Sequence, residues 1–142
     1  MNEHSYIKAI HRLLPSSLYK WKINDNFHGG VADAYYSGPA GDLWIEYKYL
    51  PRPPKRLDTV VKTCLTDQQL HWLQSRQNEG RNIALIIGIT APPEFKTRDN
   101  LIVTDLSQKV TMNTFSSSAI DKRGVADYIM ASCLGKQYHP KR

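Results

Sequence analysis

Several features that would assign a protein to a class are missing from this chain of 142 residues. No run of about 18 apolar residues occurs, so we expect no membrane span. Its two cysteines, Cys64 and Cys133, are too few for a disulfide framework, and we expect them to serve packing in a reducing compartment. The first four residues lack a basic segment followed by an apolar one, so we expect no secretory signal and a cytoplasmic protein.

Two kinds of catalytic motif are also absent. The histidines do not have the spacing of a zinc site; they are His4, His11, His28, His71 and His139. No nucleophile motif accompanies a serine, so a Ser-His-Asp hydrolase is excluded. The sequence contains no internal repeat, and its one biased segment is rich in proline and basic residues.

What the chain does contain is an excess of positive charge. Lys and Arg outnumber Asp and Glu by 19 to 13, the net charge is +6, and the pI is about 9.4. This favours an anionic partner, with nucleic acid ahead of a membrane, although the charge could also serve solubility alone. With 41% apolar residues, the length suits one globular domain over residues 1–142.

The order of expected elements predicts an α/β fold. Helical periodicity covers residues 3–14 and ends at Pro15, and a strand follows at 18–23. Further helices are predicted at 68–78 and 121–134, and further strands at 82–90 and 101–103. The run at 82–90 is almost continuously apolar, which indicates a strand covered on both faces. We therefore expect a mixed central β-sheet flanked by helices.

The most informative segment lies between these elements. Asp33 follows a turn-rich stretch, and twelve residues separate it from Glu46-Tyr47-Lys48 in a probable strand. Residues 37–42 are rich in turn formers, so the two segments are predicted to form a hairpin. Because side chains alternate along a strand, Glu46 and Lys48 point one way and Tyr47 the other. Two carboxylates and a lysine on one face suit a hard divalent cation, whereas the alternative is a solvated strand face with Asp33 as a turn cap.

This pattern resembles the PD-(D/E)XK nuclease superfamily, with Ala32 in place of the proline in the family name. A second segment is similar to the VRR-NUC branch, which includes Holliday junction resolvase-like enzymes, at Thr66, Gln69, Trp72 and Gly80. The resemblance implies a restriction-endonuclease-like core at about residues 3–90. Residues 91–134 would be an accessory part, and residues 135–142 a loose basic tail.

The resemblance also implies roles for individual residues. Asp33 and Glu46 would bind Mg²⁺ or Mn²⁺, assisted by the backbone carbonyl of Tyr47. Lys48 would orient or activate the attacking water. Glu3 would complete the acidic cluster or bind a second metal, its alternative role being a helix N-terminal acid. Gln69 would bridge to a water or a phosphate, unless it is an ordinary exposed helix residue.

Basic residues follow the predicted catalytic strand. Arg52, Lys55 and Arg56 lie in a proline-rich loop, and Lys62 comes shortly after them. We predict that these residues contact a nucleic-acid backbone, which positions a substrate without reading its sequence. The alternative is a solvated basic loop. Trp72 is predicted to be a core residue.

Taken together, the residues predict a Mg²⁺- or Mn²⁺-dependent DNA endonuclease of phage or bacterial type. Structure-selective cutting of junctions or flaps, with a homodimer for junctions, is a subclass of this prediction. The alternatives are a non-catalytic DNA-binding protein that kept the nuclease fold and an RNA-directed nuclease. A third alternative is an interaction protein whose basic surface serves solubility.

Overall fold

The structure is a computed structural model, and it describes residues 1–24 and 29–135. His28, His139 and almost all of the predicted basic tail lie outside the described residues. The helices are α1 (Glu3–His11), α2 (Asp67–Asn78), α3 (Met112–Ser118) and α4 (Lys122–Leu134), with one 3₁₀ turn, η1 (Pro93–Phe95). The strands are β1 (Tyr19–Lys22), β2 (Ala34–Gly38), β3 (Gly41–Leu50), β4 (Ile83–Ile89) and β5 (Asn100–Val103).

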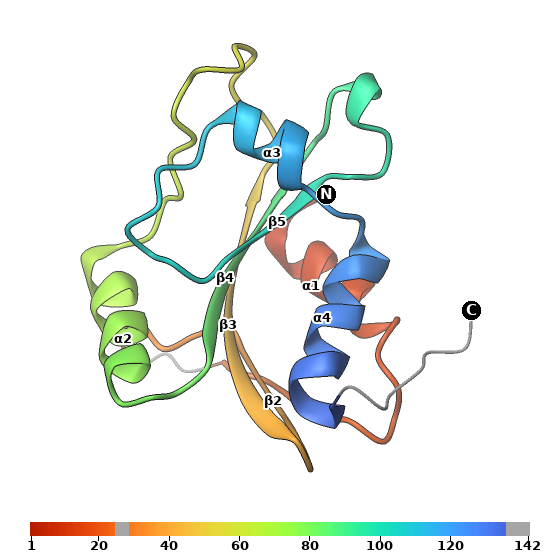
Figure 1. Ribbon diagram of the computed structural model, residues 1–142, viewed down its shortest axis with the longest axis vertical. Helices are drawn as coiled ribbons and strands as arrows, with labels where there is room; N and C mark the ends of the chain where they lie inside the picture. The colour runs from red at the N-terminus through yellow and green to blue at the C-terminus, as the bar shows by residue number, and fades with distance from the viewer. Residues whose placement is uncertain (25–28, 136–142) are drawn as a thin grey trace.

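The five strands form one mixed sheet in the order β1-β2-β3-β4-β5. Only the β3–β4 pair is parallel, and α2 makes the crossover between these two strands. In Figure 1, α2 lies on one side of the sheet and α1 and α4 lie on the other. The predicted α/β class and the mixed sheet flanked by helices are confirmed. The predicted order of elements, helix, three strands, helix and strand, is also confirmed. It is the order expected of a restriction-endonuclease-like core.

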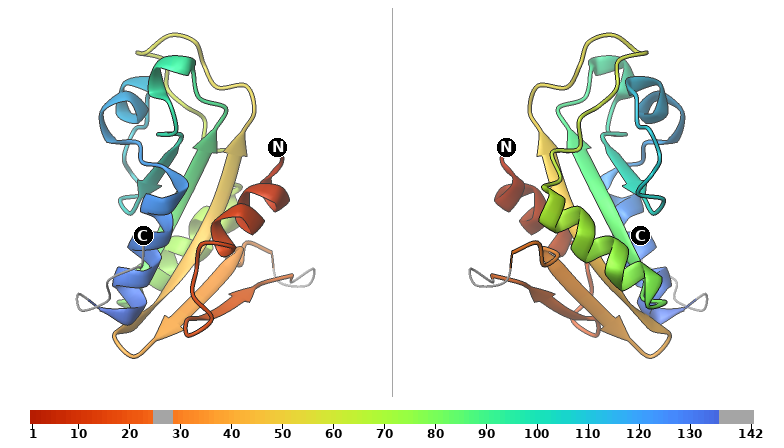
Figure 2. Two further views of the ribbon diagram at one scale, coloured as in Figure 1. Left: turned by 90° about the vertical axis from the view of Figure 1, so that its right-hand side faces the viewer. Right: turned by 90° about the vertical axis from the view of Figure 1, so that its left-hand side faces the viewer.

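Burial of β4 explains its apolar sequence. All seven residues of this strand are buried. Ile86 packs in a cluster with α1 and α4, whereas Leu85 packs on the opposite face in a cluster that includes Phe115 of α3. The view at the right of Figure 2 shows α2 running across the face opposite α1 and α4. The prediction of a strand covered on both faces is therefore confirmed.

The hairpin between β2 and β3 is tighter than predicted. Residues 37–42 were expected to be a turn, but Ser37 pairs with Asp42 and only Pro39 and Ala40 connect the strands. A Cβ on Gly38 would lie 2.4 Å from the backbone oxygen of Cys133 in α4. The glycine therefore serves close packing of strand against helix, which its sequence does not distinguish from a turn.

Helix α3 has no counterpart among the predicted elements. Its N-cap, Thr111, accepts from the amide of Thr114 in a reciprocal capping box, and Met112 and Phe115 are buried. Helix α1 also ends at His11, earlier than the predicted residue 14. Cys133 is buried as expected, but Cys64 is exposed, so the packing role predicted for Cys64 was wrong. Within the described residues, no helix is long and apolar enough to cross a membrane.

Candidate active site

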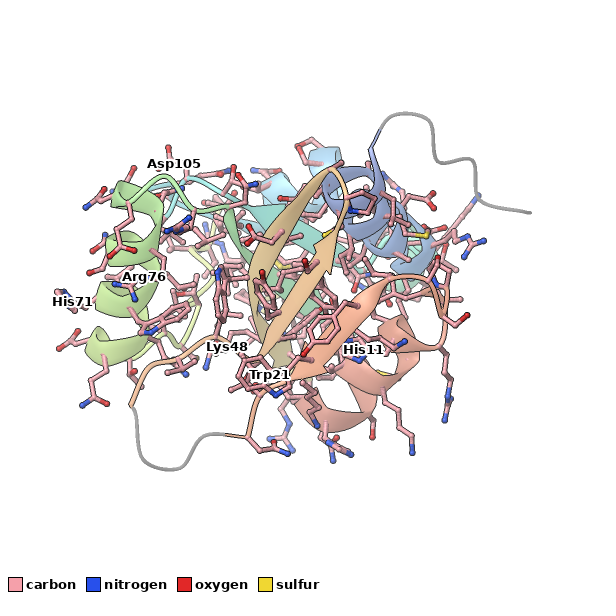
Figure 3. The ribbon with its side chains drawn as sticks, turned by 90° about the horizontal axis from the view of Figure 1, so that it is seen from below. His11, Trp21, Lys48, His71, Arg76 and Asp105 are labelled. Carbon is pink, nitrogen blue, oxygen red and sulfur yellow. The ribbon has the colours of Figure 1, made fainter. Side chains whose placement is uncertain are left out.

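The candidate site lies on the face of β3 that α2 covers. Trp44, Glu46 and Lys48 share this face because side chains alternate along the strand. Tyr47 points the other way and is fully buried in the cluster that α1 and α4 close. Figure 3 labels Lys48 on the side of the sheet toward α2. The predicted division of β3 into a charged face and a buried face is therefore present.

Asp33 stands immediately before β2, beside Glu46. Its Oδ2 accepts a hydrogen bond of 2.8 Å from the backbone amide of Tyr47, and its carbonyl accepts one of 2.8 Å from the amide of Ile23. These bonds fix Asp33 between β1 and β3. We will call Asp33, Glu46 and Lys48 the acidic site.

Glu46 is the centre of this site, with only 1% of its surface exposed. Its Oε2 accepts a hydrogen bond of 3.1 Å from Gln69 Nε2 and lies 3.5 Å from Lys48 Nζ. Its Oε1 is buried and has no hydrogen-bond partner among residues 1–24 and 29–135. A buried carboxylate oxygen with no partner is costly, so its place in the fold needs an explanation beyond stability.

Gln69 has a fixed orientation because it does two tasks. Its side-chain Oε1 accepts a hydrogen bond of 3.0 Å from the backbone amide of Thr66. Its backbone amide donates one of 3.1 Å to Thr66 Oγ1, and the two bonds form the capping box of α2. Because the side-chain oxygen of Gln69 is used in the cap, its side-chain nitrogen must face Glu46. Sequence reasoning selected Gln69 but missed this role. The spacing Thr66-x-x-Gln69 before a helix was the signal that could have found the cap.

Two glycines let the chain pass close to this end of α2. A Cβ on Gly30 would lie 2.4 Å from the backbone oxygen of Gln68, and Gly30 has φ of +89°, which favours glycine. A Cβ on Gly29 would lie 2.2 Å from Gln68 Oε1. The pair therefore packs the segment leading to Asp33 against the first turn of α2, a structural role that the sequence analysis missed.

Burial sets the charge state of the acidic site. It raises the pKa of Glu46 to about 8, with the neighbouring charge of Asp33 adding to the rise and Lys48 opposing it. Burial also raises the pKa of Asp33, against the hydrogen bond from the Tyr47 amide and the charge of Lys48. The two carboxyl groups therefore favour sharing a proton until a positive charge arrives.

Glu3 opens α1 and reaches the same region. Partial burial raises the pKa of Glu3, the charge of Lys48 lowers it, and that of Asp33 raises it. Glu3 in turn raises the pKa of Glu46. The structure thus brings together Asp33 before β2, Glu46 and Lys48 within β3, and Gln69 of α2, with Glu3 of α1 near enough for its charge to act on Glu46.

The donor set fits a hard divalent cation. Carboxylate oxygens are the ligands that Mg²⁺ prefers, and it is commonly held by one or two carboxylates while it keeps several waters. Asp33 and Glu46 would hold it, and the unpartnered Oε1 of Glu46 is an oxygen available for it. In the part of the chain that the structure describes, no three His, Cys, Asp or Glu side chains are grouped to hold a metal, so Glu3 is not a third direct ligand in this arrangement.

The basic residues predicted to contact nucleic acid lie away from the acidic site, in the loop after β3. All four are exposed: Arg52, Lys55, Arg56 and Lys62. Figure 2 shows this loop beyond the end of β3. Arg56 forms an exposed ion pair of 3.1 Å with Asp58. The loop is therefore a cationic rim rather than part of the acidic site.

No family model and no curated protein matches the chain. Among solved structures, it is similar to Hjc, a Holliday junction resolvase from the archaeal hyperthermophile Archaeoglobus fulgidus, solved at 1.6 Å resolution. The TM-score is 0.44 and the sequence identity 12%, over 87% of this chain and 99% of that chain. A TM-score of this size carries no argument about function. The candidate site therefore stands on the residues of this chain.

Proposed function

We propose that the protein is a divalent-metal-dependent nuclease that hydrolyses phosphodiester bonds in DNA. One observation carries this proposal. The carboxylate of Glu46 is buried with an unpartnered oxygen, between Asp33 and the amine of Lys48. Titratable groups with strongly shifted pKa values and a specific charged partner cluster at functional sites.

The alternative role for these residues is a structural ion pair, and its energetics do not account for the site. A buried pair stabilises a fold when further hydrogen bonds satisfy the remaining lone pairs. Gln69 satisfies one oxygen of Glu46 and leaves the other without a partner. The pair with Lys48 therefore leaves part of the desolvation of Glu46 uncompensated, which favours a chemical role over a purely structural one.

Each residue has a defined task in the proposed reaction. A bound divalent cation would acidify water and neutralise charge on the phosphate. Asp33 and Glu46 would hold that cation, and Gln69 would keep Glu46 oriented. Water would attack phosphorus in line with the bond to the 3′-oxygen and release a proton to solvent. The bond to the 3′-oxygen would break as the new one forms, and the leaving oxygen would take up a proton from solvent. Lys48 orients the attacking water and offsets negative charge in the transition state.

The net charge of +6 and the cationic rim support nucleic acid as the substrate. Structure-selective cutting of junctions or flaps, with a homodimer acting on junctions, is the finer proposal. Membership of the VRR-NUC branch stays a prediction.

The test is cleavage of a labelled panel in Mg²⁺, Mn²⁺ or EDTA. The panel contains supercoiled plasmid, linear duplex, single strand, flap, four-way junction and an RNA of matched sequence. Lys48→Met should slow metal-dependent cutting at least about a hundredfold. Lys109→Met, at an exposed lysine outside the site, is the matched control and should cut like the wild type.

Four results would change the conclusion. Salt-sensitive DNA binding with no cutting of any substrate would identify a binding protein that kept the nuclease fold. Cutting of RNA alone would identify an RNA-directed nuclease. Neither binding nor cutting would leave an interaction protein. Equal loss in both lysine variants would assign the effect to surface charge instead of Lys48.

A further inference from the structure

A groove of about 440 Å³ opens on the sheet next to the acidic site. Its described lining combines two tryptophans with apolar and polar residues: Trp21, Lys22, Ile23, Asn24, Val31 and Trp44. Among these residues there is one lysine and no acid. We will call it the aromatic groove.

The aromatic groove sits on a row of aromatic side chains across three strands. Trp21 of β1 pairs with Tyr35 of β2, and Tyr35 pairs with Trp44 of β3, so all three lie on one face. The ring centroids of Tyr35 and Trp44 are 4.4 Å apart. Trp72 of α2 continues the row, with its ring centroid 5.2 Å from that of Trp44. Aromatic contact thus crosses the sheet to α2.

Trp21 differs from the other members of the row because about half of its surface is exposed. It is 49% exposed. Within the described residues it makes no ring contact, whereas Tyr35 and Trp44 each contact other rings. Figure 3 labels Trp21 near the open edge of the sheet. An exposed indole on a rigid strand is an unused stacking surface.

The groove lies beside the acidic site along β3. Trp44 and Glu46 are two residues apart on the same face of β3, which is about 7 Å along a strand. Tyr35 has the same relation to Asp33 on the neighbouring segment. Lys20 and Lys22 alternate with Trp21 along β1 and point to the opposite face, where Lys22 Nζ contacts Nδ1 of His4 in α1. The face of β1 that carries Trp21 is therefore aromatic, and a ligand in the groove would present a flat apolar face beside the acidic site.

We propose that the aromatic groove binds an unpaired nucleobase of single-stranded DNA, stacked on Trp21. The proposal rests on the proposed function, since it assumes a DNA substrate. A base within a duplex is stacked on both faces and cannot offer one to Trp21, whereas an unpaired base can. The net charge of +6 suits the negatively charged backbone that carries the base. The groove would thereby select DNA with an unpaired segment next to the scissile phosphate.

Equilibrium binding in EDTA tests the proposal without any need for cleavage. The probes are a fluorescein-labelled oligodeoxythymidylate and an oligonucleotide of equal length built from abasic residues, both at fixed salt. Trp21→Ala should weaken binding of the base-bearing probe about fivefold or more and leave the abasic probe unchanged. Trp21→Phe should restore most of the affinity, because a phenyl ring still stacks.

Tyr19→Ala is the matched control. Tyr19 is an exposed aromatic on the same strand, 58% exposed, but it does not line the groove and its ring lies 6.4 Å from that of Tyr35. The Tyr19→Ala variant should bind both probes like the wild type. Circular dichroism and thermal melting of each variant would show that the fold is retained.

Several outcomes would overturn the proposal. Equal losses on both probes would assign the effect to phosphate contact, and no loss with Trp21→Ala would remove the stacking role. Sedimentation that shows a dimer dissociating in Trp21→Ala, with DNA affinity lost only on dissociation, would make the groove a contact for a second copy. Cleavage in Mg²⁺ is measured separately. A wild type that binds bases but never cuts would overturn only the proposed function.

Discussion

Two buried polar clusters lie on opposite faces of β3, and they differ in how completely their groups are paired. On the α1 side, His11 Nε2 lies 2.7 Å from the Tyr36 hydroxyl, which lies 2.7 Å from that of Tyr47. On the α2 side, the acidic site leaves Oε1 of Glu46 without a partner. Tyr47 belongs to both, since its side chain joins the first cluster and its amide holds Asp33 in the second.

The difference separates stability from chemistry. In the His11–Tyr36–Tyr47 network each hydroxyl has a neighbour, and burial together with Lys20 and Lys22 lowers the pKa of His11 to about 4, so its ring is neutral near pH 7. A fully paired neutral network of this kind stabilises one packing arrangement. The acidic site instead places two carboxyl groups together in a position where burial raises the pKa of both. A cation bound there would favour their ionised forms.

The sharpest way to break this comparison is to remove the charge at Glu46. Between pH 4.5, the ordinary pKa, and about 8, the unfolded chain has released a proton that the folded chain still holds. Stability of the metal-free protein therefore falls across this window and levels off above it. Glu46→Gln should abolish much of that fall. At pH 9 its free energy of unfolding should exceed that of the wild type by on the order of 3 kcal/mol.

Thermal or urea unfolding in EDTA from pH 4 to 9 measures this. Mg²⁺ should stabilise the wild type at pH 8.5 and leave Glu46→Gln unchanged, because metal binding requires the ionised carboxylate. A wild type and variant with parallel pH profiles would contradict the raised pKa of Glu46.

The second test is on the paired cluster. Tyr36→Phe removes the hydroxyl between His11 and Tyr47 and should lower the free energy of unfolding by about 1–3 kcal/mol. Cleavage per folded molecule should stay close to wild type. Tyr35→Phe is the control, because its hydroxyl donates to Asp42 in a less buried position, and it should cost less. If Tyr36→Phe slowed cleavage as much as Lys48→Met while folded, the two clusters would be one functional unit.

The smallest effect on stability is expected at Gln69. Gln69→Ala removes the side-chain half of the capping box of α2 and the donor to Glu46, and should cost about 1 kcal/mol. Gln69→Glu keeps an acceptor for the amide of Thr66 but loses the donor, so it separates the two tasks. Both variants should cut roughly tenfold more slowly, as expected for a residue that positions a metal ligand.

Thr66→Ala is the control, because it weakens only the cap, and it should cut near the wild-type rate. A tenfold loss in this variant would assign the effect to α2.

Local pattern was sufficient for much of the fold. Alternation in Leu43–Leu50 separated Glu46 and Lys48 from Tyr47, and the apolar run of β4 predicted its burial on both faces. Helix α3 escaped because its seven residues include three serines and its cap partner is Thr114 rather than Glu or Gln, so neither periodicity nor the usual capping pattern marks it. The packing role of Gly38 was not predicted, because a turn and a close approach of two backbones both favour glycine.

The sequence by itself determined the identities and spacing of Asp33, Glu46 and Lys48, the face that the latter two share, and the positive charge of the chain. Those properties are local, since alternation along a strand and summed charge need no distant partner. Only the tertiary structure decided that Glu46 is buried with one oxygen unpartnered, that Gln69 donates to it, and that Trp21, Tyr35 and Trp44 form one row. Each depends on how segments far apart in the chain pack, because burial and strand register exist only once the sheet and α2 come together.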